Sequence, residues 1–373
     1  MSRKAIFIAV ALLLASPSWA GDGKPTLLKK IANFIDTMTV SGIDTSYITM
    51  PRKPWQVMAK SNTNESMIRL RATNYELLGE NSVIHWKPDI DTRVYTSLGG
   101  WIGYRGYGLG LSRTIGNGKG SGFSIGAGGS RYGISLRMRS FESDEMKFRM
   151  QGSSPIDDHE DVIEHFDSRD KMEIDDPIKI KSLLIDGFYL LNGKRFSYSA
   201  AYDQSVIQRR SAGSVMFGVS WLQTKVDYAS PENGLLIIFM NDIGRIDQKQ
   251  LCLGAGYAYN WVPCRNVLVN AQVMPMIAAI NRIKTWTYDL YVEKSGVDED
   301  GDPKYDLVIQ PFPPEVKHSR MVVNWDAHVT LVYNSDNWFA SIAGQVNHFR
   351  YSRDNTYGRM TDWYVNTSIG IRF

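Results

Sequence analysis

Residues 362–373 read DWYVNTSIGIRF, and this stretch decides the fold. Its side chains alternate between two faces, which is the period of a β-strand with one apolar and one polar side. In water, an edge strand with so apolar a face would invite aggregation. In a closed barrel that face meets lipid and the free edge disappears. The stretch therefore predicts the last strand of a transmembrane antiparallel β-barrel. One face holds Trp363, Val365, Thr367, Ile369, Ile371 and Phe373, and the other holds Asp362, Tyr364, Asn366, Ser368, Gly370 and Arg372.

The same alternation recurs upstream, at residues 131–139, 196–203, 323–333 and 338–347. The chain has 32 glycines and 12% aromatic residues, which suits a barrel with aromatic girdles. A strand that ends on an aromatic residue, here Phe373, is similar to the signal that the barrel-assembly machinery of outer membranes reads. A net charge of +3 is too small to indicate nucleic-acid binding.

The full inventory of strands is odd, whereas single-chain bacterial barrels have even numbers. The long polar segments 142–177 and 281–320 should both lie outside the cell, yet five strands between them would place them on opposite sides. We therefore expect one more strand at 235–246, with 119–128 as a rival position, and a barrel of about 12–14 strands. The inventory is 55–61, 67–74, 93–102, 105–114, 130–141, 178–191, 194–204, 212–224, 251–261, 267–280, 321–334, 337–350 and 361–373.

The first twenty residues have the features of a signal peptide. A basic pair, Arg3 and Lys4, precedes an apolar run at 5–15, and Ser18-Trp19-Ala20 forms a cleavage site. The alternative is a membrane anchor, but the run is too short to cross roughly 30 Å of hydrocarbon. We predict a signal peptide at 1–20, a periplasmic segment at 21–54 and an outer-membrane barrel at 55–373.

Within that periplasmic segment, the apolar spacing of residues 25–35 predicts a short amphipathic helix at the periplasmic mouth, with an inward plug as the alternative. The two cysteines, Cys252 and Cys264, are separated by twelve residues of extended chain. Such a strand places them roughly 40 Å apart, so we expect no disulfide between them.

Four blocks of the mature chain suggest a family. They are GIDTSYITMPRKPWQV at 42–57, GWIGYRGYGLGLS at 100–112, GFYLLNGKRFSYSAAYDQSVIQRRSAGSVMFGVSW at 187–221 and LGAGYAYNWV at 253–262. Together they resemble the uncharacterised outer-membrane family catalogued as domain of unknown function 4421. The resemblance implies a secreted, barrel-like protein without assigned activity or known functional residues. The acidic segment 142–177 is longer than the family pattern leads us to expect.

Arginines are the first candidates for a functional site. If the apolar partners on their strands face lipid, five arginines point into the lumen, where guanidinium groups would favour anions in a pore. The alternative is an internal ion-pair network with Asp203, Asp326 and Asp362, which should also point inward. The candidate arginines are Arg69, Arg71, Arg131, Arg137 and Arg139.

His328 and Asp326 share one face of a predicted strand, and we add both to the lumen-lining candidates. A hydrolase that acts on lipid would need a serine nucleophile beside such a pair, and no GxSxG motif accompanies it. The acidic turn at 298–302 lacks the spacing of an EF-hand. We therefore assign no catalytic residue, metal or cofactor.

These patterns place the protein in the outer membrane of a Gram-negative bacterium, with outer-membrane lipid as its surroundings. We expect a non-enzymatic narrow pore or channel for small solutes, with anions as one candidate class. Two alternatives stay open. One is a structural or interaction protein that meets a surface partner through the segments 142–177 and 281–320. The other is an outer-membrane lipid-modifying enzyme.

Overall fold

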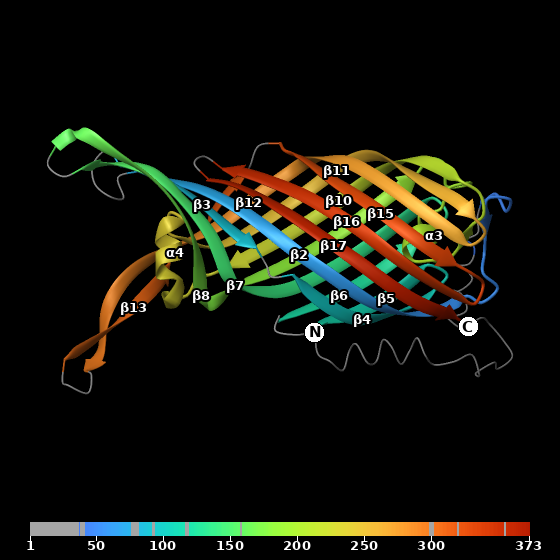
Figure 1. The fold of residues 1–373 in the computed structure, drawn as a ribbon, viewed down its shortest axis with the longest axis horizontal. Helices are drawn as coiled ribbons and strands as arrows, with labels where there is room; N and C mark the ends of the chain where they lie inside the picture. Colours follow the sequence, from blue (N-terminus) through green and yellow to red (C-terminus); the bar gives the residue numbers. More distant parts are fainter. Residues whose placement is uncertain are drawn as a thin grey trace.

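Twelve antiparallel strands close into a barrel (Figure 1). The structure is a computed structural model that describes residue 37 and residues 42–75, 82–91, 94–115, 119–156, 159–297, 302–318, 321–353 and 356–373. The expected signal peptide, the helix at 25–35 and most of the acidic turn at 298–302 lie outside the described residues.

Each barrel strand pairs with the barrel strands before and after it in the chain, and β17 pairs with β2 to complete the ring. The final register sets Arg372 opposite Gln56 and Tyr357 opposite Arg71. The twelve strands are β2 (Trp55–Tyr75), β4 (Tyr95–Tyr104), β5 (Tyr107–Ile115), β6 (Gly120–Gly128), β7 (Tyr132–Ile156), β8 (His159–Leu190), β10 (Ala212–Asp227), β11 (Ile243–Cys264), β12 (Val267–Val297), β15 (Val323–Asn334), β16 (Trp338–Arg353) and β17 (Thr356–Arg372).

This result confirms the predicted fold class and strand range but corrects several parts of the inventory. Residues 55–61 and 67–74 belong to one strand, β2. The expected extra strand at 235–246 is wrong: its first half forms the helix α4 (Gly234–Phe239) and its end begins β11. A short apolar run such as LLIIF fits a buried helix as well as a strand. The missing strand is the rival at 119–128, which is β6.

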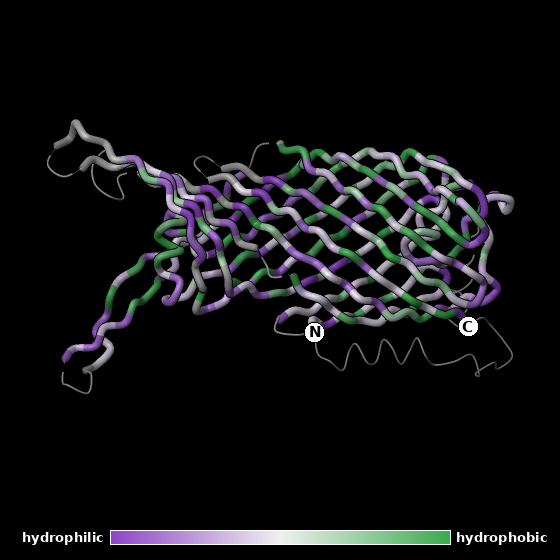
Figure 2. Tube along the Cα trace, in the orientation of Figure 1, coloured by the Kyte–Doolittle hydropathy of each residue, from purple (hydrophilic) through white to green (hydrophobic). Residues whose placement is uncertain are grey.

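The alternation of the last strand is confirmed. Along β17, Val365, Ile369 and Ile371 are exposed, whereas Asp362, Tyr364 and Ser368 between them are buried. Exposed Ile, Leu, Val and aromatic side chains form a band around the barrel, including Val329, Leu253 and Ile134. Figure 2 shows the resulting alternation of hydrophobic and hydrophilic residues along the barrel strands. An apolar outer band with a polar interior is the arrangement of a transmembrane barrel.

Two β-ribbons extend beyond one end of the barrel, which we call the ribbon end (Figure 1). One is formed by the far halves of β7 and β8, and the other by β12 with β13 (Pro303–Pro311). A short strand, β14 (Glu315–His318), also pairs with β12. The segments 142–177 and 281–320 therefore leave the barrel at the same end, as expected, although much of each is strand and not loop.

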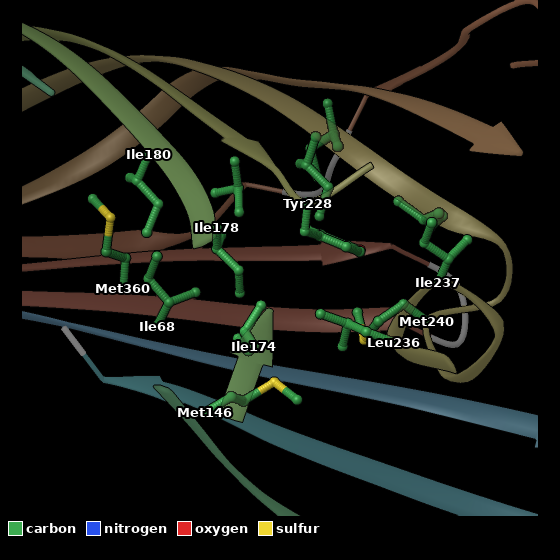
Figure 3. Packing of buried hydrophobic residues seen from close by; sticks show 14 of the residues in the cluster. Ile68, Met146, Ile174, Ile178, Ile180, Tyr228, Leu236, Ile237, Met240 and Met360 are labelled. Atoms are coloured by element: carbon green, nitrogen blue, oxygen red, sulfur yellow. The ribbon is translucent and has the colours of Figure 1, made fainter. Parts of the chain in front are cut away.

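The interior of the ribbon end is an apolar core, the ribbon-end core (Figure 3). Strand β8 contributes Ile178 and Ile180, both 0% exposed, while the alternate residues Lys179 and Lys181 face outward. The segment before β11 covers this core with the 3₁₀-helix η1 (Pro231–Asn233) and the helix α4, and the ring of Phe239 stacks on Trp86 at 3.6 Å between centroids. Here the strands bury apolar side chains and expose charged ones.

A single strand replaces three at the ribbon end. Strand β3 (Val83–Asp91) pairs with β2 on one edge and with β7 on the other. Closer to the middle of the barrel, β4, β5 and β6 fill the space between the same two neighbours. The hairpin of β5 and β6 thus widens only one part of the barrel.

The opposite end, the plug end, is filled by residues 192–211, which we call the plug. The plug contains the short helix α3 (Ser199–Tyr202) and the strand β9 (Ile207–Gln208), which pairs with β1 (Ile48–Thr49). The predicted strand at 194–204 is therefore wrong. Consecutive residues from Ser199 to Ala201 are all buried, because the chain folds inside the barrel and not along its wall.

No helix among the described residues is both long enough and apolar enough to cross a membrane. Cys252 is buried, Cys264 is exposed and both are free thiols, which confirms the expectation that they form no bond with each other.

Candidate functional site

A cavity of about 340 Å³ lies inside the barrel, between the plug and the ribbon-end core. We call it the chamber. One wall is smooth because β5 and β6 turn small residues inward, among them Ser112, Ser124 and Gly126. A Cβ atom added to Gly126 would meet no atom within 4 Å. Small side chains on this wall therefore leave the space that forms the chamber.

An arginine crosses the chamber from β7. The Arg137 guanidinium forms an ion pair with Asp186 at 3.0 Å, and Asp186 also accepts a hydrogen bond from Ser220 at 2.6 Å. The same guanidinium donates to the Tyr364 hydroxyl on β17 and to the Gln345 amide oxygen on β16, the latter at 3.3 Å. These contacts join walls that lie far apart around the ring of strands.

A second arginine on β7 makes a parallel connection. Arg139 pairs with Asp362 of β17 at 3.3 Å, and its guanidinium lies 5.8 Å from the ring centre of Tyr364. The Asp362 side chain is only 5% exposed, whereas that of Arg139 keeps 22% exposure. The partly exposed guanidinium indicates that water reaches this part of the interior.

His328 and Asp326 form the polar centre of the opposite wall. His328 Nε2 lies 2.8 Å from Asp326 Oδ1, and Gln345 donates a 2.9 Å hydrogen bond to the same carboxylate oxygen. The His328 ring meets Tyr202 of the plug edge-on, at 5.3 Å between centroids. The histidine thus links the wall of the chamber to the plug.

The plug is held by side chains of the barrel that hydrogen-bond to its backbone. Gln56 donates to the Asp203 carbonyl at 2.6 Å, Asn260 to the Ser197 carbonyl at 2.8 Å, and Asn334 to the Val206 carbonyl at 2.9 Å. Arg372 donates to the Gln204 carbonyl and to Asn334 Oδ1. Buried carbonyl groups need such partners, so these four side chains stabilise a loop that would otherwise be costly to bury.

The model of the family described as Domain of unknown function (DUF4421) matches residues 42–373. The chain belongs to this family. The match covers most of the chain, and it agrees with the resemblance seen in the four sequence blocks. No curated protein matches the chain.

Several solved structures share parts of the DUF4421 architecture at low sequence identity. The outer membrane protease OmpT from Escherichia coli is 10% identical, with a TM-score of 0.37, over 87% of this chain and 97% of OmpT. The translocator domain of the autotransporter NalP from Neisseria meningitidis is 9% identical, with a TM-score of 0.27, over 92% and 94%. The Pseudomonas putida toluene transporter TodX is 8% identical, with a TM-score of 0.29, over 90% and 94%. These likenesses carry no functional argument.

Four of the seven predicted lumen residues of this DUF4421 chain line the chamber: Arg137, Arg139, Asp326 and His328. The two arginines are paired with aspartates, which is the arrangement of the internal network that we kept as the alternative to an anion filter. Asp203 also lines the chamber, from the plug.

Arg69 and Arg71 do not point into the lumen, and for them the prediction is wrong. Ile68 faces the ribbon-end core, so its neighbours on β2 face outward; Arg71 is exposed, and Arg69 pairs with Asp89 at 3.3 Å. The prediction assumed that apolar residues face lipid, which fails where the interior itself is apolar. Arg131 precedes β7 at the plug end, against Gly193, and is not part of the chamber lining.

Sequence reasoning missed the plug and the residues that hold it. Gln56, Asn260 and Asn334 looked like ordinary inward polar residues of their strands. The available signal was their side chain type: an inward amide can bond a buried backbone, which an apolar or small side chain cannot. Among the described residues, no serine, threonine or cysteine hydrogen-bonds to His328, and no three His, Cys, Asp or Glu side chains gather as metal ligands.

Proposed function

We propose that this protein is an outer-membrane channel for small solutes and that the structure is its closed state. Two closures block the barrel, the plug at one end and the ribbon-end core at the other, and solutes pass through the chamber when both move. The observation that carries the proposal is the chamber itself, a space of about 340 Å³ inside the barrel that is lined by both polar and apolar side chains. Twelve strands give a barrel that side chains could still largely fill, since about 8 strands leave no open space and 16 leave a water-filled channel. Glycine and serine on β5 and β6 keep this interior open.

The two closures differ in chemistry. The plug is bound through hydrogen bonds from Gln56, Asn260 and Asn334 to its backbone, and water can replace each of these bonds when the plug moves. The ribbon-end core is apolar and is covered by Ile237 and Met240 of the segment around α4. Hydrophobic constrictions gate channels by excluding water. In this proposal the apolar band faces outer-membrane lipid and the ribbon end faces the exterior.

Conductance of the purified protein in planar bilayers tests the proposal. In the plug variant, an Asn-Gly turn replaces residues 192–214, and β8 stays paired with β10 because Leu190 already lies opposite Met216. The core variant is Ile237→Ser with Met240→Ser. We expect closed wild-type protein and discrete conductance steps only when both changes are combined.

The matched control is Leu235→Ser, which is made in place of the two core substitutions. Leu235 is exposed on the outer face of the same helix. Combined with the plug variant, this control should stay closed. Each variant is first checked for heat-modifiable migration in gel electrophoresis, a property of folded barrels. Folded protein that carries both changes and still conducts no ions would overturn the proposal.

A second function is favoured by the β12–β13 ribbon. Val292 is 64% exposed and Tyr305 is 57% exposed on one face of this ribbon, and Leu290 and Ile309 on the same face pack against the ribbon-end core. An apolar face that continues beyond the barrel suits contact with a surface partner. Replacing residues 291–308 by a two-residue turn should remove a cross-linked partner from intact cells, while a variant shortened at the tip of the β7–β8 ribbon keeps it. Unchanged cross-links in the first variant would exclude this function.

A further inference from the structure

The charged side chains that line the chamber are balanced in number. Lys60, Arg137 and Arg139 are positive, and Asp186, Asp203 and Asp326 are negative. Arg137 and Arg139 have carboxylate partners within 3.0 and 3.3 Å. An ion that enters would compete with these pairs and would gain little from the field of the wall, since opposite charges cancel over a few ångströms. The chamber is therefore poorly suited to anions and to cations.

The uncharged lining combines an apolar and aromatic surface with a set of hydrogen-bonding groups. Hydroxyl groups come from Ser112 and Ser124 on the smooth wall, and amides come from Asn62 and Asn366 on β2 and β17. Tyrosine rings border the same space from the plug and from β17, and Tyr198 and Tyr202 of the plug stack at 4.2 Å between centroids. Hydroxyls and amides both donate and accept hydrogen bonds, and aromatic faces bind the apolar faces of ligands.

The size of the chamber limits the solute further. A volume of about 340 Å³ lies at the lower end of the roughly 300–1,000 Å³ of small-molecule sites. It accommodates one ring with its hydroxyl groups and excludes a chain of several rings. A solute that is small, neutral, rich in hydroxyl groups and apolar on its ring faces satisfies all three properties of the lining.

We infer that the chamber binds a neutral polyhydroxylated solute of the size of a monosaccharide. The inference rests on the proposed function in one respect, since the bound solute is then the one that the channel conducts. Arg137 and Arg139 in this view hold the walls together through Tyr364 and Asp362 of β17, and hydroxyl and amide groups contact the solute.

Equilibrium dialysis of the folded full chain in detergent tests this inference with radiolabelled D-glucose, D-glucuronate and D-glucosamine. The three probes share a six-membered sugar ring and differ in charge. Dialysis is continued until the bound fraction is constant, which allows for slow opening of the plug. We expect D-glucose to saturate one site. The two charged probes should bind at least about tenfold more weakly, because each would bring an unpaired charge among existing pairs. Equal or tighter binding of D-glucuronate, or no binding of any probe, would overturn the inference.

Two glycines provide a matched pair of variants. Gly126 and Gly344 both border the chamber with their backbone. A side chain added at Gly126 would point into the chamber, whereas one added at Gly344 would point outward, between the exposed Val329 and Val365 of the neighbouring strands. At both positions an added Cβ meets no atom within 4 Å. Gly126→Leu should fill the chamber and abolish D-glucose binding, and Gly344→Leu should leave it unchanged. Equal D-glucose binding by both folded variants would place the solute elsewhere and overturn the assignment.

The outcomes separate the inference from the proposed function. If the combined plug and core variant conducts ions but the wild-type protein does not bind D-glucose, the channel proposal stands and the solute class is overturned. If D-glucose binds and Gly126→Leu removes this binding, but the combined variant does not conduct ions, the solute class stands and the channel proposal is overturned.

Discussion

The outer band of the barrel and the ribbon end are built from the same strands with opposite polarity. On β8, Ile185 and Tyr189 are exposed in the band, while Asp186 faces the chamber. Seven residues earlier on the same strand, Ile178 is buried and Lys179 is exposed. In a membrane the band would place its apolar residues against lipid, whereas the ribbon end folds like a water-soluble β-protein around its own core. The same strand thus carries apolar residues on its outer face in the band and on its inner face at the ribbon end.

The largest effect is expected from the ribbon-end core. Ile178→Ala leaves a cavity at a position that is 0% exposed, and such a truncation costs about 2–5 kcal/mol. Denaturant unfolding of the reconstituted protein measures the loss. Lys179→Ala, the next residue on the outer face, should change the free energy of unfolding by no more than about 0.5 kcal/mol. Equal losses for the two variants would contradict the core described here.

A charge placed on the outer surface distinguishes the two regions directly. Val329 is 60% exposed in the apolar band and Val292 is 64% exposed on the β12–β13 ribbon. Val329→Arg should destabilise the protein by about 2–4 kcal/mol if this position lies near the middle of the membrane. Val292→Arg, which meets water, should stay within about 0.5 kcal/mol of the wild type. Unfolding in lipid bilayers is the measurement, and a tolerated arginine at 329 would remove this surface from the membrane.

Two arginines that look alike in the sequence should differ in a smaller way. Arg139→Ala leaves the carboxylate of Asp362, 5% exposed, without its ion-pair partner, at a cost of about 1–3 kcal/mol. Arg69→Ala breaks a pair whose Asp89 side chain is 43% exposed, which is worth about 0–1 kcal/mol. The double variant Arg139→Ala, Asp362→Asn should recover part of the first loss. A larger loss from Arg69→Ala would reverse the assignment of inner and outer faces.

The smallest effect concerns acid and the β7–β8 ribbon. The Arg149 guanidinium hydrogen-bonds Asp167 and holds the pKa of that carboxyl well below its usual range. Because the folded pKa is lowered, the contribution of the pair is complete above the pKa of the unfolded chain, about 4. It is lost as the pH falls through the folded pKa. Amide exchange in the ribbon, corrected for intrinsic rates, should therefore be constant from neutral pH to about pH 5 and rise in stronger acid.

In Asp167→Asn the pH dependence that comes from this pair should disappear, while exchange in the barrel strands serves as the internal reference. Acid-sensitive exchange that persists unchanged in Asp167→Asn would assign the effect to other carboxylates.

The parts of the fold that the sequence predicts correctly are those with a single solvent on each side. Strands β15 and β17 lie in the band, so Trp325 and Val329, or Ile369 and Ile371, mark the outer face reliably. Arg69 fails because Ile68 beside it faces a core and not lipid. Periodicity reports that two faces differ and is silent on which face is interior.

The plug was missed for a related reason. Phe196, Ala200 and Val206 are apolar at positions that a strand could explain, but they are buried in apolar clusters inside the barrel. Asn260 and Asn334 hold the plug backbone there, at the Ser197 and Val206 carbonyls. Of the site, Arg137, Arg139, Asp326 and His328 were predictable from alternation. Their partners were not. Tyr364 and Gln345 meet Arg137 across the barrel, and Asp186 meets it from the adjacent strand β8, and no spacing along the chain encodes these contacts.

The replacement of β4, β5 and β6 by β3 separates two dimensions of the molecule. The circumference around the chamber includes the β5–β6 hairpin, whereas the circumference at the ribbon end, where β3 lies between β2 and β7, does not. Gain or loss of one such hairpin during evolution would change the diameter of the barrel around the chamber, because diameter grows with strand number. The ribbon-end core would stay the same. Members of the family can thus differ in barrel width while they keep the same ribbon-end core.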